Sequence, residues 1–190
     1  MAGYHPGSDV IIVMGVCGCG KTTVGEALAE ELDAVFVEGD SVHPKANREK
    51  MERGEALTDD DRWPWLDALA KQALGCILDS SGLPVTPVVV LAASCLARKY
   101  RDRIRSHRGL AGVARVSFVH LEIDQDTASA RVAARGTNHF MPESLVPSQF
   151  EVLEELEEDE YGVTIDARLS DPPTLILSIL SSLSIPSLLS

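Results

Sequence analysis

The stretch Val10-Ile11-Ile12-Val13-Met14-Gly15-Val16-Cys17-Gly18-Cys19-Gly20-Lys21-Thr22 decides the fold of this 190-residue chain. Its first five residues form an unbroken apolar run of strand length, as expected for a central parallel strand that is covered on both faces. Beyond the glycines, apolar residues recur at helical spacing and predict a helix that starts near Lys21. These residues are Val24, Ala27, Leu28 and Leu32. The stretch therefore predicts a strand, a loop and a helix in that order.

The loop from Gly15 to Thr22 satisfies the phosphate-binding pattern G-x-x-x-x-G-K-[ST] in the strand-to-helix setting that this pattern requires. In such a loop, backbone N–H groups and the helix N-terminus surround the phosphates of a nucleotide. We expect Lys21 to reach the β- and γ-phosphates of ATP and Thr22 to hold Mg²⁺. The predicted nucleotide-binding residues are Gly15, Val16, Cys17, Gly18, Cys19, Gly20, Lys21, Thr22 and Thr23. For the two cysteines, a reactive thiolate and an inert buried thiol both stay open.

The remaining apolar runs predict an α/β fold with a parallel five-stranded sheet flanked by helices. The further strands are expected at Ala34–Val37, Val88–Ala92, Val116–Leu121 and Val163–Asp166, and helices at Pro44–Arg53 and Asp59–Leu78. Two other segments are open to misreading. The acidic run Glu151–Glu160 is interpreted as a solvated helix face. Thr174–Ser190 is interpreted as a packed surface helix, because serines and Pro186 interrupt it too often for a membrane span.

Length and charge limit the class of protein. One domain, residues 10–190, is expected behind a flexible N-terminal tail, residues 1–9, that lacks the features of a signal peptide. A net charge of −12 argues against a surface for nucleic acid or an anionic membrane, because both need clustered Lys and Arg. The 4 cysteines have no CxxC spacing, which favours reduced thiols and a cytoplasmic location.

Two carboxylates mark the end of the second predicted strand. Glu38 and Asp40 are expected on the same side of that strand, at the sheet edge where open α/β sheets bind ligands. One can organise the water around Mg²⁺ while the other accepts a hydroxyl proton. A solvated turn is the alternative interpretation.

The residues that follow resemble those of the gluconokinase family. The family patterns G-D-x-x-H-P, N-x-x-K-M, P-L-x-D-x-D-R-x-P-W-L, G-H-F-M-P and S-Q-F-x-x-L-E are matched nearly throughout. They fall on Gly39–Pro44, Asn47–Met51, Ala56–Leu66, Asn138–Pro142 and Ser148–Glu154. Tyr100-Arg101-Asp102 adds a further block.

This resemblance implies a nucleoside-monophosphate-kinase-like fold with a small lid at about residues 131–150, and a homodimer. It also implies ATP-dependent phosphorylation of D-gluconate to 6-phospho-D-gluconate with Mg²⁺. The implied substrate-binding residues are Asp40, His43, Lys50, Arg62, Arg98, His139 and Gln149. The implied catalytic residues are Lys21, Asp40, Arg131 and Arg135, with Thr22 and Glu38 at the metal.

Several of these roles have structural alternatives. Arg62 suits the substrate carboxylate, although it could instead form a surface ion pair with Asp59 or Asp61. His43 and His139 could be structural histidines. Arg131 and Arg135 lie four residues apart, so on a helix they face one way, either as lid arginines or as a solvated basic face.

The chain also departs from the family pattern. Ala97 stands where the family has a lysine, so either Arg98 or Lys99 is expected to replace it or the affinity for the substrate is expected to fall. Two other functions therefore stay open: a kinase of another small acceptor such as shikimate, and an ATP-binding regulatory module whose kinase site has decayed.

Overall fold

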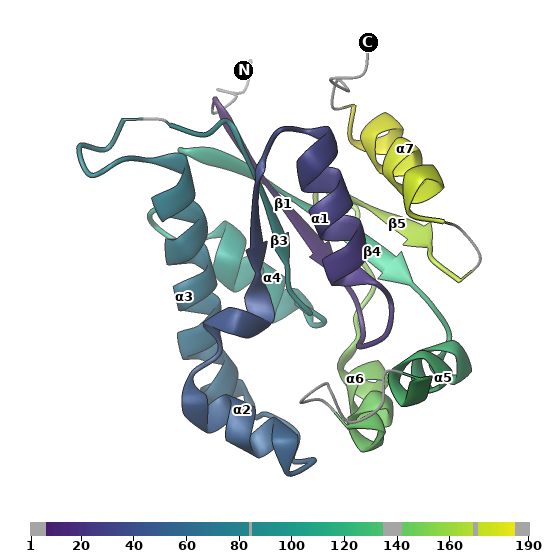
Figure 1. Cartoon of the computed structure of the whole chain (residues 1–190). Coiled ribbons are helices and arrows are strands. Elements are labelled where there is room, and N and C mark those ends of the chain that lie inside the picture. The colour runs from purple at the N-terminus through teal and green to yellow at the C-terminus, as the bar shows by residue number, and fades with distance from the viewer. Residues whose placement is uncertain (1–6, 84, 135–141, 169–170, 185–190) are drawn as a thin grey trace.

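The computed structural model describes residues 7–83, 85–134, 142–168 and 171–184. It contains five parallel strands in the order β2-β3-β1-β4-β5, which confirms the predicted α/β sheet (Figure 1). The strands are β1 (Ser8–Met14), β2 (Val35–Glu38), β3 (Val88–Ala92), β4 (Ala114–Glu122) and β5 (Gly162–Asp166).

Helices cover both faces of this sheet. They are α1 (Lys21–Glu31), α2 (Lys45–Glu52), α3 (Asp59–Ile77), α4 (Arg98–Arg105), α5 (Gln125–Ala134), α6 (Val146–Val152) and α7 (Pro172–Leu183), with 3-10 turns η1 (Gly39–Val42) and η3 (Glu143–Leu145). Alternate residues of β1 point to opposite faces. Ile11 and Val13 pack with α1 and α7, whereas Val10 and Ile12 pack with α3 and α4. Figure 1 shows α2 and α6 at the same end of the molecule.

The first strand begins two residues earlier than expected. Ser8 and Asp9, assigned to the tail from the sequence, belong to β1. The Asp9 backbone N donates to Pro87 O at 2.7 Å, and the Asp9 carboxylate accepts from Arg115 Nε at 2.6 Å. Polar residues can extend this strand because the neighbouring segments supply partners for them.

The prediction of a helix over Glu151–Glu160 is wrong beyond the second residue. Helix α6 ends at Val152, and the chain then runs irregularly along α4. The buried Arg101 guanidinium donates to the backbone carbonyls of Glu154 and Glu155 and to the carboxylate of Glu160, whose side chain is 0% exposed. Arg101, from helix α4, thus donates to carbonyl groups that would have accepted from backbone N–H groups in an α-helix.

The apolar C-terminal segment is a surface helix, as predicted, but it is shorter than expected. Helix α7 ends at Leu183, and residues 185–190 lie outside the described part of the chain. Its buried residues, among them Leu175 and Ile179, pack in the same cluster as α1. No helix in the described residues combines the length and apolarity that spanning a membrane requires.

Candidate active site

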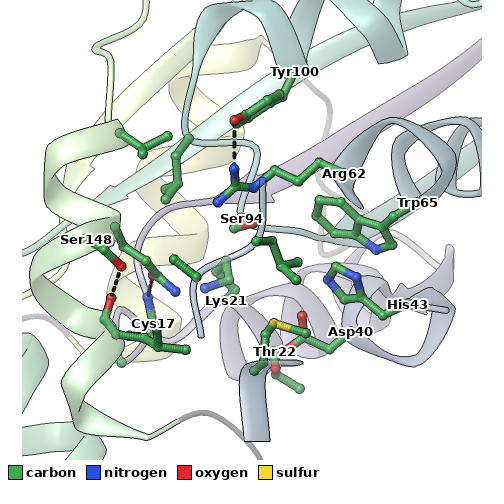
Figure 2. Close-up of a pocket in the computed structure, with 18 of the residues that line it drawn as sticks. Cys17, Lys21, Thr22, Asp40, His43, Arg62, Trp65, Ser94, Tyr100 and Ser148 are labelled. Carbon is green, nitrogen blue, oxygen red and sulfur yellow. Dashed lines mark hydrogen bonds between the residues drawn. The ribbon is translucent and has the colours of Figure 1, made fainter. Parts of the chain in front are cut away.

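A cleft opens at the carboxyl edge of the sheet. Its walls come from the phosphate loop, the end of β2 with η1, the start of α3, the loop after β3, and α6 (Figure 2). The lining residues are Cys17, Gly18, Gly20, Lys21, Thr22, Glu38, Asp40, His43, Met51, Ala56, Leu57, Arg62, Trp65, Ser94, Leu96, Tyr100, Leu145, Ser148, Gln149 and Val152.

The phosphate loop needs its glycines for conformation and for space. Gly15, Gly18 and Gly20 have φ values of 137°, 82° and 103°, a region that favours glycine. A Cβ on Gly15 would lie 2.8 Å from Leu121 O, so a side chain there would displace the backbone. Lys21 Nζ donates to Val16 O at 2.9 Å and lines the cleft. This conformation supports the predicted nucleotide site.

The predicted metal pair meets at one corner of the cleft. Thr22 Oγ1 donates to Glu38 Oε2 at 2.7 Å, and Asp40 N donates to Glu38 Oε1 at 3.2 Å. A hydroxyl and a carboxylate beside a phosphate loop fit Mg²⁺, which prefers oxygen ligands and takes most of the others from water and phosphate. The described residues contain no group of three or more His, Cys, Asp and Glu that could hold a metal ion by themselves.

Asp40 lines the cleft as predicted, but for a different structural reason. The strand ends at Glu38, and Asp40 sits in the 3-10 turn η1 rather than two residues further along the strand. Strand alternation therefore does not explain why both carboxylates line the cleft. The turn does, because Glu38 accepts from the backbone N of Asp40 at the start of η1.

His43 is held as a neutral ring against Trp65. The two rings stack with centroids 4.2 Å apart, and Asn47 Nδ2 lies 3.4 Å from His43 Nδ1. Burial, together with the charges of Arg48 and Arg62, lowers the pKa of His43 to about 4. Because an amide NH₂ only donates, Nδ1 accepts and the proton sits on Nε2. Trp65 is buried, and its Nε1 donates to Gly39 O at 2.9 Å.

Arg62 and Gln149 approach the cleft from opposite walls. Arg62 Nη1 donates to the Tyr100 hydroxyl at 2.9 Å, while the guanidinium points toward the centre of the cleft in Figure 2. Gln149 Oε1 accepts from the backbone N of Cys17 at 2.6 Å, so this side chain contacts the phosphate loop.

Two predicted substrate ligands lie outside the cleft lining. Arg98 is bound by acidic residues, with ion pairs of 3.1 Å to Asp102, 2.9 Å to Glu157 and 2.6 Å to Asp159. Lys50 pairs with Asp61 at 2.7 Å. Neither cation is among the residues that line the cleft. These carboxylates already neutralise the charge of the Arg98 guanidinium. Arg98 would therefore gain little by binding a substrate in the cleft.

Four other predicted residues lie outside the cleft lining or outside the described part of the chain. Arg131 donates to the carbonyls of Gly18, Ala167 and Arg168, so it contacts the phosphate loop from outside the cleft. Thr23 is exposed on α1 and does not line the cleft. Arg135 and His139, with the rest of residues 135–141 of the expected lid, lie outside the described residues.

Sequence reasoning missed several cleft residues. Tyr100 appears in the sequence only as part of a resemblance block, and Ser94 and Leu96 carry no signal of their own. Tyr100 lies on α4, and Ser94 and Leu96 lie in the loop after β3. These residues line the cleft because both segments pack beside α3.

Several known proteins are similar to this chain in sequence and fold. A family model described as "AAA domain" matches residues 10–156. A probable gluconokinase of Schizosaccharomyces pombe is 40% identical over 162 residues, which cover 84% of this chain and 79% of that protein. The chain belongs to the gluconokinase family. A gluconokinase of Arabidopsis thaliana is 36% identical, with 90% of each chain covered. The crystal structure of a gluconokinase from Sinorhizobium meliloti 1021 has a TM-score of 0.74 at 34% identity, covering 95% of this chain and 94% of that one.

Within the gluconokinase pattern, the residue expected to replace the missing lysine is not found. Ala97 is buried, Arg98 is bound by acidic residues, and Lys99 pairs with Asp59. Among the described cleft residues, the permanent cations are Lys21 and Arg62. Lys21 belongs to the phosphate loop. Arg62 is therefore the described cleft cation that is available to bind a negatively charged acceptor.

Proposed function

We propose that the protein transfers the γ-phosphoryl group of ATP to the 6-hydroxyl of D-gluconate and forms 6-phospho-D-gluconate. The observation that carries this proposal is the shared cleft of a phosphate loop, the Asp40 carboxylate and the Arg62 guanidinium. A phosphoryl donor site, a group that orients a hydroxyl and a cation for a carboxylate are the parts that this reaction needs. The gluconokinase names of its relatives support the same acceptor.

Each wall of the cleft has a separate task in this proposal. The loop amides and Lys21 bind the phosphates of ATP, and Thr22 with Glu38 would hold Mg²⁺ and its water. When bound, Mg²⁺ neutralises charge on the phosphate oxygens. Asp40 orients the 6-hydroxyl and accepts its proton as the new O–P bond forms and the bond to the bridging oxygen of ADP breaks.

At the acceptor end, Arg62 binds the carboxylate of gluconate with charge-assisted hydrogen bonds. His43 offers a neutral Nε2–H to a substrate hydroxyl, since its other ring nitrogen faces Asn47. Gln149 remains a substrate-binding residue in this proposal, on the wall of the cleft that contacts the phosphate loop.

The proposal also keeps Arg131 and Arg135 as the arginines that stabilise the transferred charge. Arg131 contacts Gly18 O at 3.4 Å, which supports a position beside the phosphates. A homodimer is proposed on the family resemblance, and a cytoplasmic location on the cysteine spacing.

A coupled assay of ADP release, with and without D-gluconate, tests this function. We expect release that depends on gluconate in the wild type, and its loss in Lys21→Ala, because no other described cleft cation belongs to the phosphate loop. Shikimate and nucleoside monophosphates are assayed in parallel, and preference for one of them would replace gluconate as the acceptor. ATP binding without turnover of any acceptor would indicate the decayed regulatory module.

A further inference from the structure

Arg62 is held by a partner that belongs to another helix. The Tyr100 hydroxyl accepts from Arg62 Nη1 at 2.9 Å and donates to Asp59 Oδ1 at 2.6 Å. The guanidinium carbon of Arg62 lies 5.2 Å from the centroid of the Tyr100 ring, and Arg62 Nη1 lies 3.9 Å from Asp59. One hydroxyl thus joins the arginine to a carboxylate and fixes the position of both.

The backbone around this contact is also well defined. Helix α3 starts with a capping box formed by Thr58 and Asp61, so Asp59 and Arg62 stand one turn apart on the first turns of the helix. Tyr100 comes from α4, which packs with α3 in the core, and its side chain is 3% exposed. The hydroxyl therefore has little freedom to leave the arginine.

The contact uses one edge of the guanidinium and leaves the edge that suits a carboxylate. In the described part of the chain, the Nε and Nη2 groups of Arg62 donate to no protein atom, whereas Nη1 is bound to Tyr100. Arg103 shows how this other edge binds: its Nε and Nη2 donate to the two oxygens of Asp67 at 2.7 and 2.8 Å. Such paired hydrogen bonds are the strong mode of carboxylate recognition.

We propose that Tyr100 and Asp59 are positioning residues that hold Arg62 so that its Nε and Nη2 edge receives the carboxylate of the acceptor. This inference rests on the proposed function and adds the residues that select a carboxylate-bearing acceptor. Burial and the hydrogen bond to Asp59 together raise the pKa of Tyr100 to about 12, so the hydroxyl keeps its proton at working pH. Lys99 pairs with Oδ2 of Asp59, the carboxylate oxygen that Tyr100 does not contact.

The test is Tyr100→Phe, which removes the hydroxyl and keeps the ring, measured beside Tyr161→Phe. Tyr161 is the matched control because its hydroxyl donates to Leu183 O at 2.9 Å and it does not line the cleft. Tyr100→Phe should raise the KM for D-gluconate about tenfold, the scale expected for a lost hydrogen bond to a charged group. The KM for ATP should stay within about twofold in both variants, and Tyr161→Phe should leave both values unchanged. An unchanged KM for gluconate in Tyr100→Phe would overturn the proposal.

A double-mutant cycle with Arg62→Ala separates positioning from direct binding. If Tyr100 acts through Arg62, Tyr100→Phe should change the KM for gluconate less than about twofold once the arginine is gone. The same tenfold effect in both backgrounds would mean that Tyr100 binds the substrate itself, and the proposal would be wrong. Should Tyr100→Phe fold poorly, Asp59→Asn takes its place in the cycle, with the same direction of change expected. Wild-type turnover of gluconate checks the proposed function separately, because the cycle compares only variants of an enzyme that already phosphorylates it.

Discussion

Thr22 Oγ1 donates a 2.7 Å hydrogen bond to Glu38 Oε2, which joins the first turn of α1 to the end of β2. The two residues are 16 positions apart in the chain. Parallel strands bring them together, because the phosphate loop after β1 and the end of β2 meet at the same edge of the sheet. In the proposed reaction this edge holds the metal.

Replacing Glu38 with glutamine should therefore weaken the metal site more than the nucleotide site. We expect the Mg²⁺ concentration at half-maximal activity to rise 10-fold or more, roughly the cost of losing a residue that orients metal ligands. The measurement is activity against Mg²⁺ concentration at saturating ATP. Glu26→Gln, an exposed carboxylate on α1, is the control and should leave the midpoint unchanged. Equal midpoints for the two variants would remove Glu38 from the metal site.

The proposed role of Asp40 predicts a large loss of turnover with little loss of binding. Asp40→Asn should lower kcat on the order of a hundredfold, the usual scale for a general base. Calorimetry should show normal ATP affinity. Asp60→Asn changes an exposed carboxylate on α3 and should act like the wild type. If Asp40→Asn retains kcat within about threefold, the assignment is wrong and Glu38 becomes the next candidate.

His43 predicts a specific dependence of stability on pH. Burial, with the charges of Arg48 and Arg62, lowers its pKa from 6.5 to about 4, so the folded protein binds this proton less readily than the unfolded chain does. The stabilising contribution is complete above pH 6.5 and is lost as pH falls toward 4. It amounts to about 3 kcal/mol at most, because one pKa unit corresponds to about 1.4 kcal/mol.

Urea denaturation of the wild type and His43→Gln at pH 7 and pH 4 tests this dependence. Burial also lowers the pKa of His120, which gives the wild type and the variant the same background slope. The difference in unfolding free energy between the two proteins should therefore be smaller at pH 4 than at pH 7. Parallel losses of stability would show that His43 titrates normally in the folded protein.

The buried pair of Arg101 and Glu160 predicts the largest effect on stability. Both side chains are 0% exposed, and Arg101 Nε lies 2.7 Å from Glu160 Oε1. Glu160→Gln leaves the guanidinium buried without its counter-ion, which costs about 3–5 kcal/mol for a buried pair. Urea midpoints measure the loss. Glu158→Gln, from the same acidic run but exposed, should change the midpoint little. Similar midpoints for the two variants would contradict this account.

The sequence by itself determined the sheet, the phosphate loop and the family. These features depend on local spacing, because an apolar run, a glycine loop and a helical repeat are each read within about twenty residues. The loop pattern predicted Lys21 and Thr22 in the site, and the family resemblance predicted Asp40 and Arg62 there. All four line the cleft. Their catalytic and binding roles stay predictions.

Only the tertiary structure decided which cations face the cleft. Arg98 stands in a stretch that the resemblance assigns to the substrate, yet Asp159, 61 residues later, binds its guanidinium. Tyr100 holds Arg62 across 38 residues, and Gln149 reaches Cys17 across 132. The direction of a charged side chain depends on which opposite charges and donors the packing brings near it. That information lies in contacts between distant segments, and no local pattern in the sequence contains it.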